Sequence, residues 1–174
     1  DFWDKLPEQL WVSYPTPYAE TFLSVSQTQQ VEPSILYAIT RRESRFRPQA
    51  ESFANALGLM QLVPSTAKEV ALLGGMKIDD LSTSLKNPEI NVSLGGLFVK
   101  KLLQEFAGRK EHVFAAYNAG IYPVQKWIKR HPTQDKALWI EMIPFAETRE
   151  YVKEVYANYA VYDYLTRVQT TSAN

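Results

Sequence analysis

The sequence predicts an all-α protein, and three observations lead to that prediction. Apolar residues recur three or four positions apart along nearly the whole chain, which is the period of an α-helix. Prolines stand where such stretches begin, at Pro33, Pro64 and Pro88, and proline is favoured in the first turn of a helix. Glycines stand where two stretches end, at Gly74 and Gly120, as they often do at helix C-termini.

The first half of the chain predicts three helices. An amphipathic helix runs from Tyr18 to about Thr28. A second opens at Pro33 and stops at Arg47-Pro48, because the residue before a proline is disfavoured in a helix. Small and turn-prone residues over 50–61 predict an irregular segment. The third helix runs from Pro64 to Gly74-Gly75.

The second half predicts a long helix, three short ones and a final long one. Asn87 is a good N-cap residue directly before Pro88, so a helix begins there and runs to about Phe106. A dense stripe of tyrosines and valines marks the last helix. The remaining predicted helices are Glu111–Asn118, Val124–Lys129, Ala137–Met142 and Phe145–Val168.

The chain predicts one domain over residues 1–174, with its core at about 17–168. Its 174 residues are enough to bury a core, and 45% hydrophobic with 22% charged residues is a globular balance. No internal repeat or linker divides it, and no apolar run approaches the roughly 18 residues of a membrane span. The chain begins at Asp1 without a signal-peptide pattern, so we expect a processed or excised piece of a longer protein.

Composition excludes several function classes. The 19 basic and 19 acidic residues cancel, whereas a nucleic-acid binder needs a basic surplus; Lys126, Lys129 and Arg130 are better interpreted as a solvated helix face. The absence of cysteine excludes disulfides, thiolate nucleophiles and cysteine-ligated metals. The two histidines, His112 and His131, form no zinc-hydrolase motif, and no glycine-rich phosphate loop follows a strand pattern. We therefore expect no metal, no cofactor and no nucleic acid.

Glu43 is the most informative residue of the chain. Ile35, Leu36 and Ile39 form an apolar helical stripe, and Glu43 continues it near the end of the same helix. Apolar surroundings and the C-terminal helix dipole both favour a protonated carboxyl, as a general acid requires. The alternative is an ordinary helix-end glutamate, either solvated or paired with Arg41, Arg45 or Arg47.

No second acid accompanies Glu43 in an obvious way. Glycosidases usually use two carboxylates, about 5 Å apart or more than about 6.5 Å apart. Glu51 lies in the irregular segment, and Glu147 belongs to a helix distant in sequence. A mechanism with one carboxylate would have to take its nucleophile from the substrate.

Four segments in order resemble the soluble lytic transglycosylase family. They are Arg42–Phe46, Gly58–Pro64, Ala115–Gly120 and Ile143–Val152, and the resemblance covers about residues 30–160. It implies a lysozyme-like fold of the g-type, with Glu43 at the head of the cleft. The partners it implies are peptidoglycan glycan strands and muropeptides, in the bacterial envelope and specifically the periplasm, for a protein that we expect to be a monomer.

The resemblance also implies the chemistry. Glu43 would protonate the oxygen that links N-acetylmuramic acid to N-acetylglucosamine, while the 2-acetamido group stabilises the charge at the anomeric carbon. The Glu43 carboxylate would then take the proton of the 6-hydroxyl group of the same sugar, which closes a 1,6-anhydro ring. No water is consumed, so the reaction is that of a lyase.

Further matched positions receive roles by the same resemblance. Tyr117 would form a hydrogen bond near Glu43 or to the acetamido group. Gln61 and Asn118 would form hydrogen bonds with sugar amides. The other positions are Met60 and Val63 on the apolar side of the cleft, Ser52 as a substrate contact and Glu147 facing the groove.

These positions also have purely structural interpretations. The alternatives are a core tyrosine for Tyr117, a turn residue for Ser52, helix packing for Met60 and Val63, and an ion pair with Arg149 or Lys153 for Glu147. Tyr151 is better interpreted as a core residue than as a sugar platform. Two whole-domain alternatives stay open beside the transglycosylase: a hydrolytic muramidase of the same fold, and a non-catalytic peptidoglycan-binding module.

Three features depart from the family pattern or concern other sites. Ile121-Tyr122-Pro123 replaces small residues after Gly120, which predicts a bulkier loop at that end of the groove. Phe53, Asn55 and Leu57 replace small residues before Gly58. The glycosylation sequon at Asn91 lies inside a predicted helix, so we do not expect it to be used.

Overall fold

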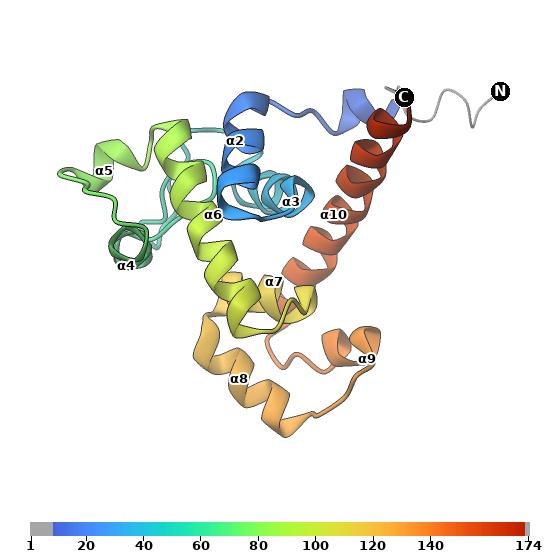
Figure 1. Ribbon diagram of the computed structural model, residues 1–174. Coiled ribbons are helices and arrows are strands. Elements are labelled where there is room, and N and C mark those ends of the chain that lie inside the picture. Colours follow the sequence, from blue (N-terminus) through green and yellow to red (C-terminus); the bar gives the residue numbers. More distant parts are fainter. Residues whose placement is uncertain (1–8, 173–174) are drawn as a thin grey trace.

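The computed structural model describes residues 9–172, and the regular secondary structure within them consists of α-helices (Figure 1). Two isolated antiparallel bridges, Glu51 to Leu57 and Leu57 to Leu62, order the segment between α3 and α4. This confirms the all-α prediction. Besides a helical turn at residues 9–13, the helices are α2 Ala19–Gln29, α3 Pro33–Ser44, α4 Pro64–Leu73, α5 Leu81–Ser84, α6 Pro88–Glu105, α7 Lys110–Ala119, α8 Ile121–Arg130, α9 Lys136–Glu141 and α10 Ala146–Ser172.

Helix α3 lies at the centre of the molecule, with α2, α6 and α10 packed around it (Figure 1). The predicted stripe of Ile35, Leu36 and Ile39 is fully buried. The burial extends beyond that stripe, because Thr40 is also fully buried and donates its hydroxyl to the Leu36 carbonyl at 2.8 Å. Residues 34–40 of α3 are thus buried on all sides, as in a core helix, whereas Arg41, Arg42 and Glu43 in its last turn are half-buried.

The core consists of two clusters of apolar side chains. The larger one joins α2, α3, α7 and α10 and includes Phe22, Ile39 and Tyr151. The smaller one joins α4, the beginning of α6 and the 57–62 loop. Phe98 and Tyr117 pack against both clusters, so the two cores meet at these two rings.

A fully buried asparagine holds the 57–62 loop on α6. The Asn91 side chain accepts a hydrogen bond from the Met60 N–H at 2.7 Å and donates to the carbonyls of Leu57 and Leu85 at 2.9 and 2.8 Å. Gly58 makes this close approach possible, because a Cβ at this position would lie 2.0 Å from the Leu85 carbonyl oxygen. The φ angle of Gly58 is +79°, which is also a conformation that glycine adopts more easily than other residues. The burial of Asn91 also agrees with the expectation that its sequon is not used.

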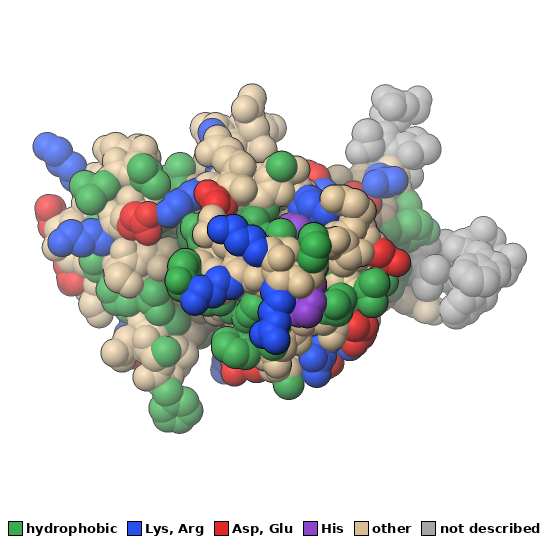
Figure 2. All heavy atoms as spheres, turned by 90° about the horizontal axis from the view of Figure 1, so that it is seen from below, with side chains coloured by type: hydrophobic (Ala, Val, Ile, Leu, Met, Phe, Trp, Pro, Cys, Tyr) green, Lys and Arg blue, Asp and Glu red, His purple; other side chains and the backbone are tan. Residues whose placement is uncertain are grey.

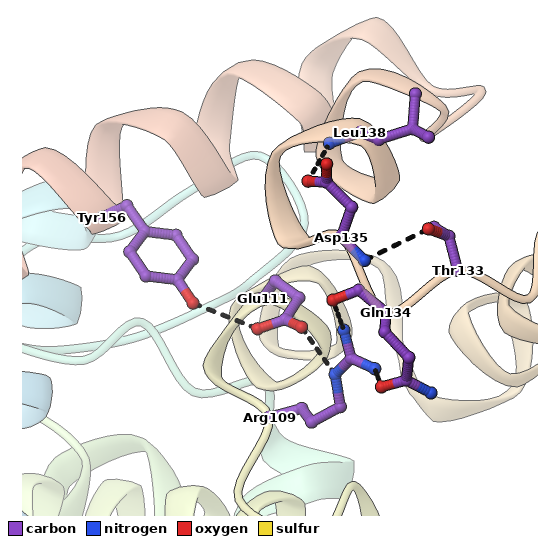
Figure 3. A network of polar contacts seen from close by, with 7 residues as sticks. All are labelled: Arg109, Glu111, Thr133, Gln134, Asp135, Leu138 and Tyr156. Carbon is purple, nitrogen blue, oxygen red and sulfur yellow. Dashed lines mark hydrogen bonds and ion pairs between the residues drawn. The ribbon is translucent and has the colours of Figure 1, made fainter.

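Helix α7 is tied to its neighbours by a polar network (Figure 3). Glu111, only 5% exposed, accepts hydrogen bonds from Arg109 Nε at 2.6 Å and from the Tyr156 hydroxyl at 3.1 Å. Arg109 also donates to Gln134 Oε1 at 2.7 Å. Asp135 caps α9 by accepting the Leu138 N–H at 3.0 Å. The network fixes the first turn of α7, whose other end carries Tyr117.

The predicted helices agree with the structure except at some ends and in two omissions, the helical turn at residues 9–13 and α5. Helix α3 ends at Ser44, three residues early, because Arg45 and Phe46 take left-handed φ values of 51° and 62°. Helix α8 begins directly after Gly120, since Pro123 falls within its first turn. Helix α5 was not predicted. Asp80 caps it by accepting the N–H groups of Ser82 and Thr83, but four residues are too few for a periodic pattern.

The surface agrees with the charge analysis. Lys126, Lys129 and Arg130 are exposed on α8, the lowest helix in Figure 1, and Figure 2 shows Lys and Arg side chains gathered on that lower face. This confirms the interpretation of these residues as a solvated helix face. Among the helices of residues 9–172, none combines the length and the apolar character needed to cross a membrane.

Candidate active site

Glu43 lies in the last turn of α3, where the chain leaves the core. Arg45 closes the helix in a left-handed conformation, and its N–H donates to the Arg41 carbonyl. Ser44 is 1% exposed, and its hydroxyl donates to the Leu59 carbonyl at 2.7 Å, which fastens the 57–62 loop to the helix end. The two neighbouring side chains thus point to different places: Ser44 faces the 57–62 loop, and Glu43 faces a groove.

The groove has a volume of about 610 Å³. It is bordered by the end of α3, the 52–63 segment, the beginning of α4, the middle of α6, the end of α7 and the beginning of α10. Its lining residues are Glu43, Ser52, Phe53, Ala54, Ala56, Gln61, Leu62, Val63, Thr66, Phe98, Ala116, Tyr117, Asn118, Ala119, Gly120 and Glu147. The structure therefore brings seven of the eight predicted site residues to one surface.

The eighth predicted residue, Met60, does not reach the groove. Its side chain is fully buried and lies so close to α6 that a Cβ at Gly95 would be 2.2 Å from the methionine sulfur. Val63, the other residue predicted on the apolar side of the cleft, does line the groove, together with Phe98, which was not predicted. Sequence periodicity could not separate the two possibilities, because a core methionine and a cleft methionine have the same neighbours along the chain.

The surroundings of Glu43 favour its protonated form. Burial raises the pKa of Glu43 from 4.5 to about 7, against the lowering effects of a hydrogen bond from Tyr151 and of the Arg42 guanidinium group. The Tyr151 hydroxyl donates to Glu43 Oε1 at 2.6 Å. A carboxyl with a pKa near neutrality can both release and accept a proton at physiological pH.

Arginines do not neutralise Glu43, contrary to the ion-pair alternative. Arg42 forms its ion pair with Glu154, and its guanidinium carbon lies 5.4 Å from the centre of the Tyr151 ring. Arg41 lies over the Tyr14 ring at 4.1 Å, and Arg47 Nε donates to the Ser44 carbonyl. A second hollow of about 660 Å³ beside these arginines contains the Arg42–Glu154 ion pair and not Glu43. The chemistry therefore points to the groove with Glu43.

Tyr117 lies close to Glu43 but donates its hydrogen bond elsewhere. Its hydroxyl donates to the Met60 carbonyl at 2.8 Å, and its ring lies 5.1 Å from that of Phe98. Burial raises the pKa of Tyr117 well above its ordinary value, and the negative charge of Glu43 adds to this effect. The phenol thus stays protonated beside the acid, and its oxygen lone pairs remain available as acceptors.

The side chains of two polar residues in the 50–62 segment form hydrogen bonds within that segment. The Ser52 hydroxyl accepts the Ala56 N–H at 3.0 Å, which is the turn role allowed for it above. Gln61 Nε2 donates to the carbonyls of Ala50 and Gly58 at 3.0 and 2.9 Å. Both hydrogens of that amide nitrogen are used, so Gln61 has its carbonyl oxygen left to offer a ligand.

Asn118, at the end of α7, and Glu147, at the beginning of α10, line the same groove as this segment. Asn118 Oδ1 accepts the Thr148 hydroxyl at 2.7 Å, which leaves its NH₂ group to donate. Glu147 is exposed in the first turn of α10. The partners proposed for it as an alternative bind elsewhere: Lys153 pairs with Glu141 and Glu150, and Arg149 donates to the Ile143 carbonyl.

Comparison with known proteins identifies the family. Residues 20–140 match the family model described as the transglycosylase SLT domain. The chain belongs to the transglycosylase SLT domain family. This confirms the resemblance drawn from the four sequence segments.

Relatives of this SLT domain are similar over nearly all of its length. It is 33% identical over 163 residues to the soluble lytic murein transglycosylase of Escherichia coli K12, which is 93% of this chain and 25% of that protein. The crystal structure of the 70-kDa soluble lytic transglycosylase from Escherichia coli superimposes with a TM-score of 0.86 at 32% identity, covering 93% of this chain and 26% of that one.

A structure of lytic transglycosylase Slt from Pseudomonas aeruginosa, an inactive mutant, gives a TM-score of 0.83 at 35% identity and covers 88% of this chain and 25% of that one. These matches confirm the predicted lysozyme-like lytic transglycosylase fold. The chain spans about a quarter of the length of these relatives.

From the sequence, no role in the site was assigned to Tyr151, which contacts Glu43, or to Phe53, which lines the groove of the SLT domain. Tyr151 was interpreted as a core residue; it is 2% exposed, as a core residue should be, yet its hydroxyl is the direct partner of Glu43. Phe53 was noted only as a departure from the family pattern, and it lines the groove. Within residues 9–172, no group of three or more His, Asp or Glu side chains is arranged to hold a metal ion.

Proposed function

We propose that this domain is a peptidoglycan lytic transglycosylase with Glu43 as its only acid and base. The observation that carries the proposal is the carboxyl of Glu43 in the groove, with its pKa raised to about 7 and a tyrosine rather than an arginine as its direct partner. The relatives that cover nearly all of the chain are named as lytic transglycosylases, and the substrate follows from murein in those names.

The first step is proton donation. Protonated Glu43 gives its proton to the oxygen of the β-1,4 linkage between N-acetylmuramic acid and N-acetylglucosamine, and the bond to the anomeric carbon breaks. The 2-acetamido group of the muramic acid stabilises the positive charge that develops there. Tyr151, whose hydroxyl donates to Glu43 Oε1, then stabilises the carboxylate that remains.

The second step returns the proton. The Glu43 carboxylate takes the proton of the 6-hydroxyl group of the same sugar, and the oxygen closes a 1,6-anhydro ring at the anomeric carbon. A pKa near 7 suits a group that has to act as acid and then as base. Gln61 and Asn118, each with one amide function left free by the fold, hold sugar amides in this scheme.

A hydrolytic muramidase is the second candidate, and one observation favours it. Glu147 is exposed in the same groove and could activate a water molecule as a second carboxylate. The reaction products separate the two functions, since a hydrolase leaves reducing muramic acid ends and the transglycosylase leaves anhydro ends that are lighter by one water.

The test is digestion of purified cell-wall sacculi followed by mass spectrometry of the products. We expect 1,6-anhydro ends from the wild-type domain and from Glu147→Gln. Glu43→Gln should lower the rate by at least about a hundredfold, because general acid–base catalysis contributes on the order of 10² to 10⁴. Reducing ends would support the muramidase, and unchanged activity of Glu43→Gln would remove Glu43 from the mechanism.

The cellular location that we propose for the domain follows from its proposed substrate. We propose that the domain acts in the bacterial cell envelope, in the periplasm, as a monomer on glycan strands and muropeptides. Binding without cleavage by the wild-type domain, in the sacculus assay, would favour the non-catalytic module instead.

A further inference from the structure

Phe53 is exposed to an unusual degree for a large apolar side chain. Its relative exposure is 111%, the highest among the exposed large hydrophobic residues of the described chain. The side chain lines the same groove as Glu43, Gln61 and Glu147. Single exposed apolar residues are common on surfaces, but an aromatic ring at the edge of a ligand groove is a candidate contact.

The loop that carries Phe53 is ordered by its own hydrogen bonds. Ser52 and Ala56 pair twice, through Ser52 N–H to the Ala56 carbonyl and through Ala56 N–H to the Ser52 hydroxyl, both at 3.0 Å. Asn55, in a left-handed conformation, closes the turn by donating its N–H to the Ser52 carbonyl. The ring is therefore held out from a tight turn.

The base of this turn is fastened to the site. Gly58 N–H and Gln61 Nε2 both donate to the Ala50 carbonyl, at 2.9 and 3.0 Å. Glu51 and Leu57 form an antiparallel bridge across the two arms. Since Gln61 itself lines the groove, the fold sets the position of the Phe53 backbone relative to the polar groups of the site, and a ligand meets the ring on a preorganised turn.

The polar and apolar side chains that line the groove indicate the chemistry of the ligand that would contact the Phe53 ring. Ser52, Gln61, Asn118 and Glu147 offer polar groups, so a purely apolar partner would leave them without water. A pyranose ring carries hydroxyl and amide groups at its edge and C–H groups on its face. The negative face of a phenyl ring attracts such C–H groups, and their contact removes apolar surface of both from water.

We propose that Phe53 is a stacking platform for one sugar ring of the glycan strand, and that it sets the affinity of the groove for the strand. This inference rests on the proposed function, because it concerns the same groove and substrate class. Phe53 has no group that could donate, accept or hold a proton. It therefore contributes equally to the ground state and the transition state, and affects KM rather than kcat.

The binding test uses a hexamer of β-1,4-linked N-acetylglucosamine and isothermal titration calorimetry, in the Glu43→Gln background so that no turnover occurs. We expect Phe53→Ala to raise Kd by about tenfold, as loss of an aromatic contact in a binding site commonly does. Phe53→Trp should keep the affinity within about twofold of the parent, since the platform is retained. Leu72→Ala is the matched control, because Leu72 is 73% exposed on α4 and lies outside the groove lining.

The kinetic test uses solubilised glycan strands and the wild-type background. Phe53→Ala should raise KM by about tenfold with kcat within about twofold, and its melting temperature should equal that of the wild type because the side chain is fully exposed. An unchanged Kd, or a loss of kcat at unchanged KM, overturns the proposal. Failure of the proposed function is distinguishable, since a wild-type domain without lytic activity can still bind the hexamer in a manner that depends on Phe53.

Discussion

The proton on Glu43 is governed by a balance between burial and two polar neighbours. Burial raises the pKa, and the Tyr151 hydroxyl and the Arg42 guanidinium group lower it. In the proposed mechanism Glu43 has to be protonated when substrate binds, so kcat/KM should fall as the pH rises through about 7. Tyr151→Phe removes a hydrogen bond to the charged form, so the pKa rises and the alkaline fall should move up by about one pH unit.

The pH profile of kcat/KM on solubilised strands measures this shift. Tyr156→Phe is the control, because it removes a hydroxyl from the same helix that donates to Glu111 instead of Glu43. Its profile should coincide with that of the wild type. A Tyr151→Phe profile that moves to lower pH, or not at all, would contradict the assigned role of the Tyr151 hydrogen bond.

At the scale of elements, the 57–62 loop depends on α6 through Asn91. Replacing Asn91 with alanine leaves the Met60 N–H and the Leu85 carbonyl without the hydrogen bonds that Asn91 makes to them. It also removes one of the two hydrogen bonds that the Leu57 carbonyl accepts, because the Leu62 N–H still donates to that carbonyl. We expect a loss of about 3 kcal/mol in the free energy of unfolding, measured by urea denaturation, because each unsatisfied buried group costs about 1–3 kcal/mol and some relaxation occurs.

Gln104→Ala, an exposed position on the same helix, should change the stability by less than about 0.5 kcal/mol. The Asn91→Ala domain that remains folded should also lose activity, because Gln61 belongs to the loop that Asn91 holds. An Asn91→Ala domain as stable as the wild type would show that the loop is held by packing alone.

The elements differ in how far the sequence could predict them. The long helices were predictable because periodicity and proline or glycine signals agree over ten or more residues, as in α6. The four residues of α5 carry no period, and the burial of residues 34–40 of α3 on all sides follows from the helices around it rather than from its own pattern. The ordered turn around Phe53 depends on pairings such as Ser52 with Ala56, which composition does not reveal.

The candidate site, like the helices, could be predicted from the sequence only in part. The direction of Glu43 followed from the stripe of Ile35, Leu36 and Ile39, because a helix carries residues spaced by three or four on one face. The resemblance supplied the groove residues of the other segments. Tyr151 and Met60 show the limit of prediction from the sequence. Whether a side chain in a core-facing position also reaches a cleft depends on contacts between elements far apart in sequence.

At the scale of the whole molecule, the groove lies where the two apolar clusters meet. Tyr117 and Phe98 pack against both clusters and also line the groove. The smaller cluster supports the 57–62 loop and α4, and the larger one supports Glu43 and Tyr151. The site is thus assembled from both halves of the core, so that its geometry depends on the stability of the entire fold.

Two buried groups make that stability depend on pH in opposite directions. The pKa of Glu43 is raised from 4.5 to about 7, so the folded state binds more protons than the unfolded state between these values, and stability falls as pH rises. Burial lowers the pKa of His112 from 6.5 to about 4, so stability is lost as pH falls through that window. Between about pH 4.5 and 6.5 the two effects oppose each other in the wild-type protein.

Glu43→Gln should separate them. The variant keeps the shape and the acceptor for Tyr151 but cannot carry the buried charge that destabilises the wild type at high pH. Relative to the wild type, its free energy of unfolding should therefore rise by about 3 kcal/mol between pH 4.5 and pH 8, as the pKa difference of Glu43 requires. Urea denaturation at the two pH values measures this difference, with the exposed Glu147→Gln as a control that should follow the wild type. A Glu43→Gln curve parallel to that of the wild type would mean that the carboxyl is not held in an environment that opposes its charge, and the proposed acid would lose its physical basis.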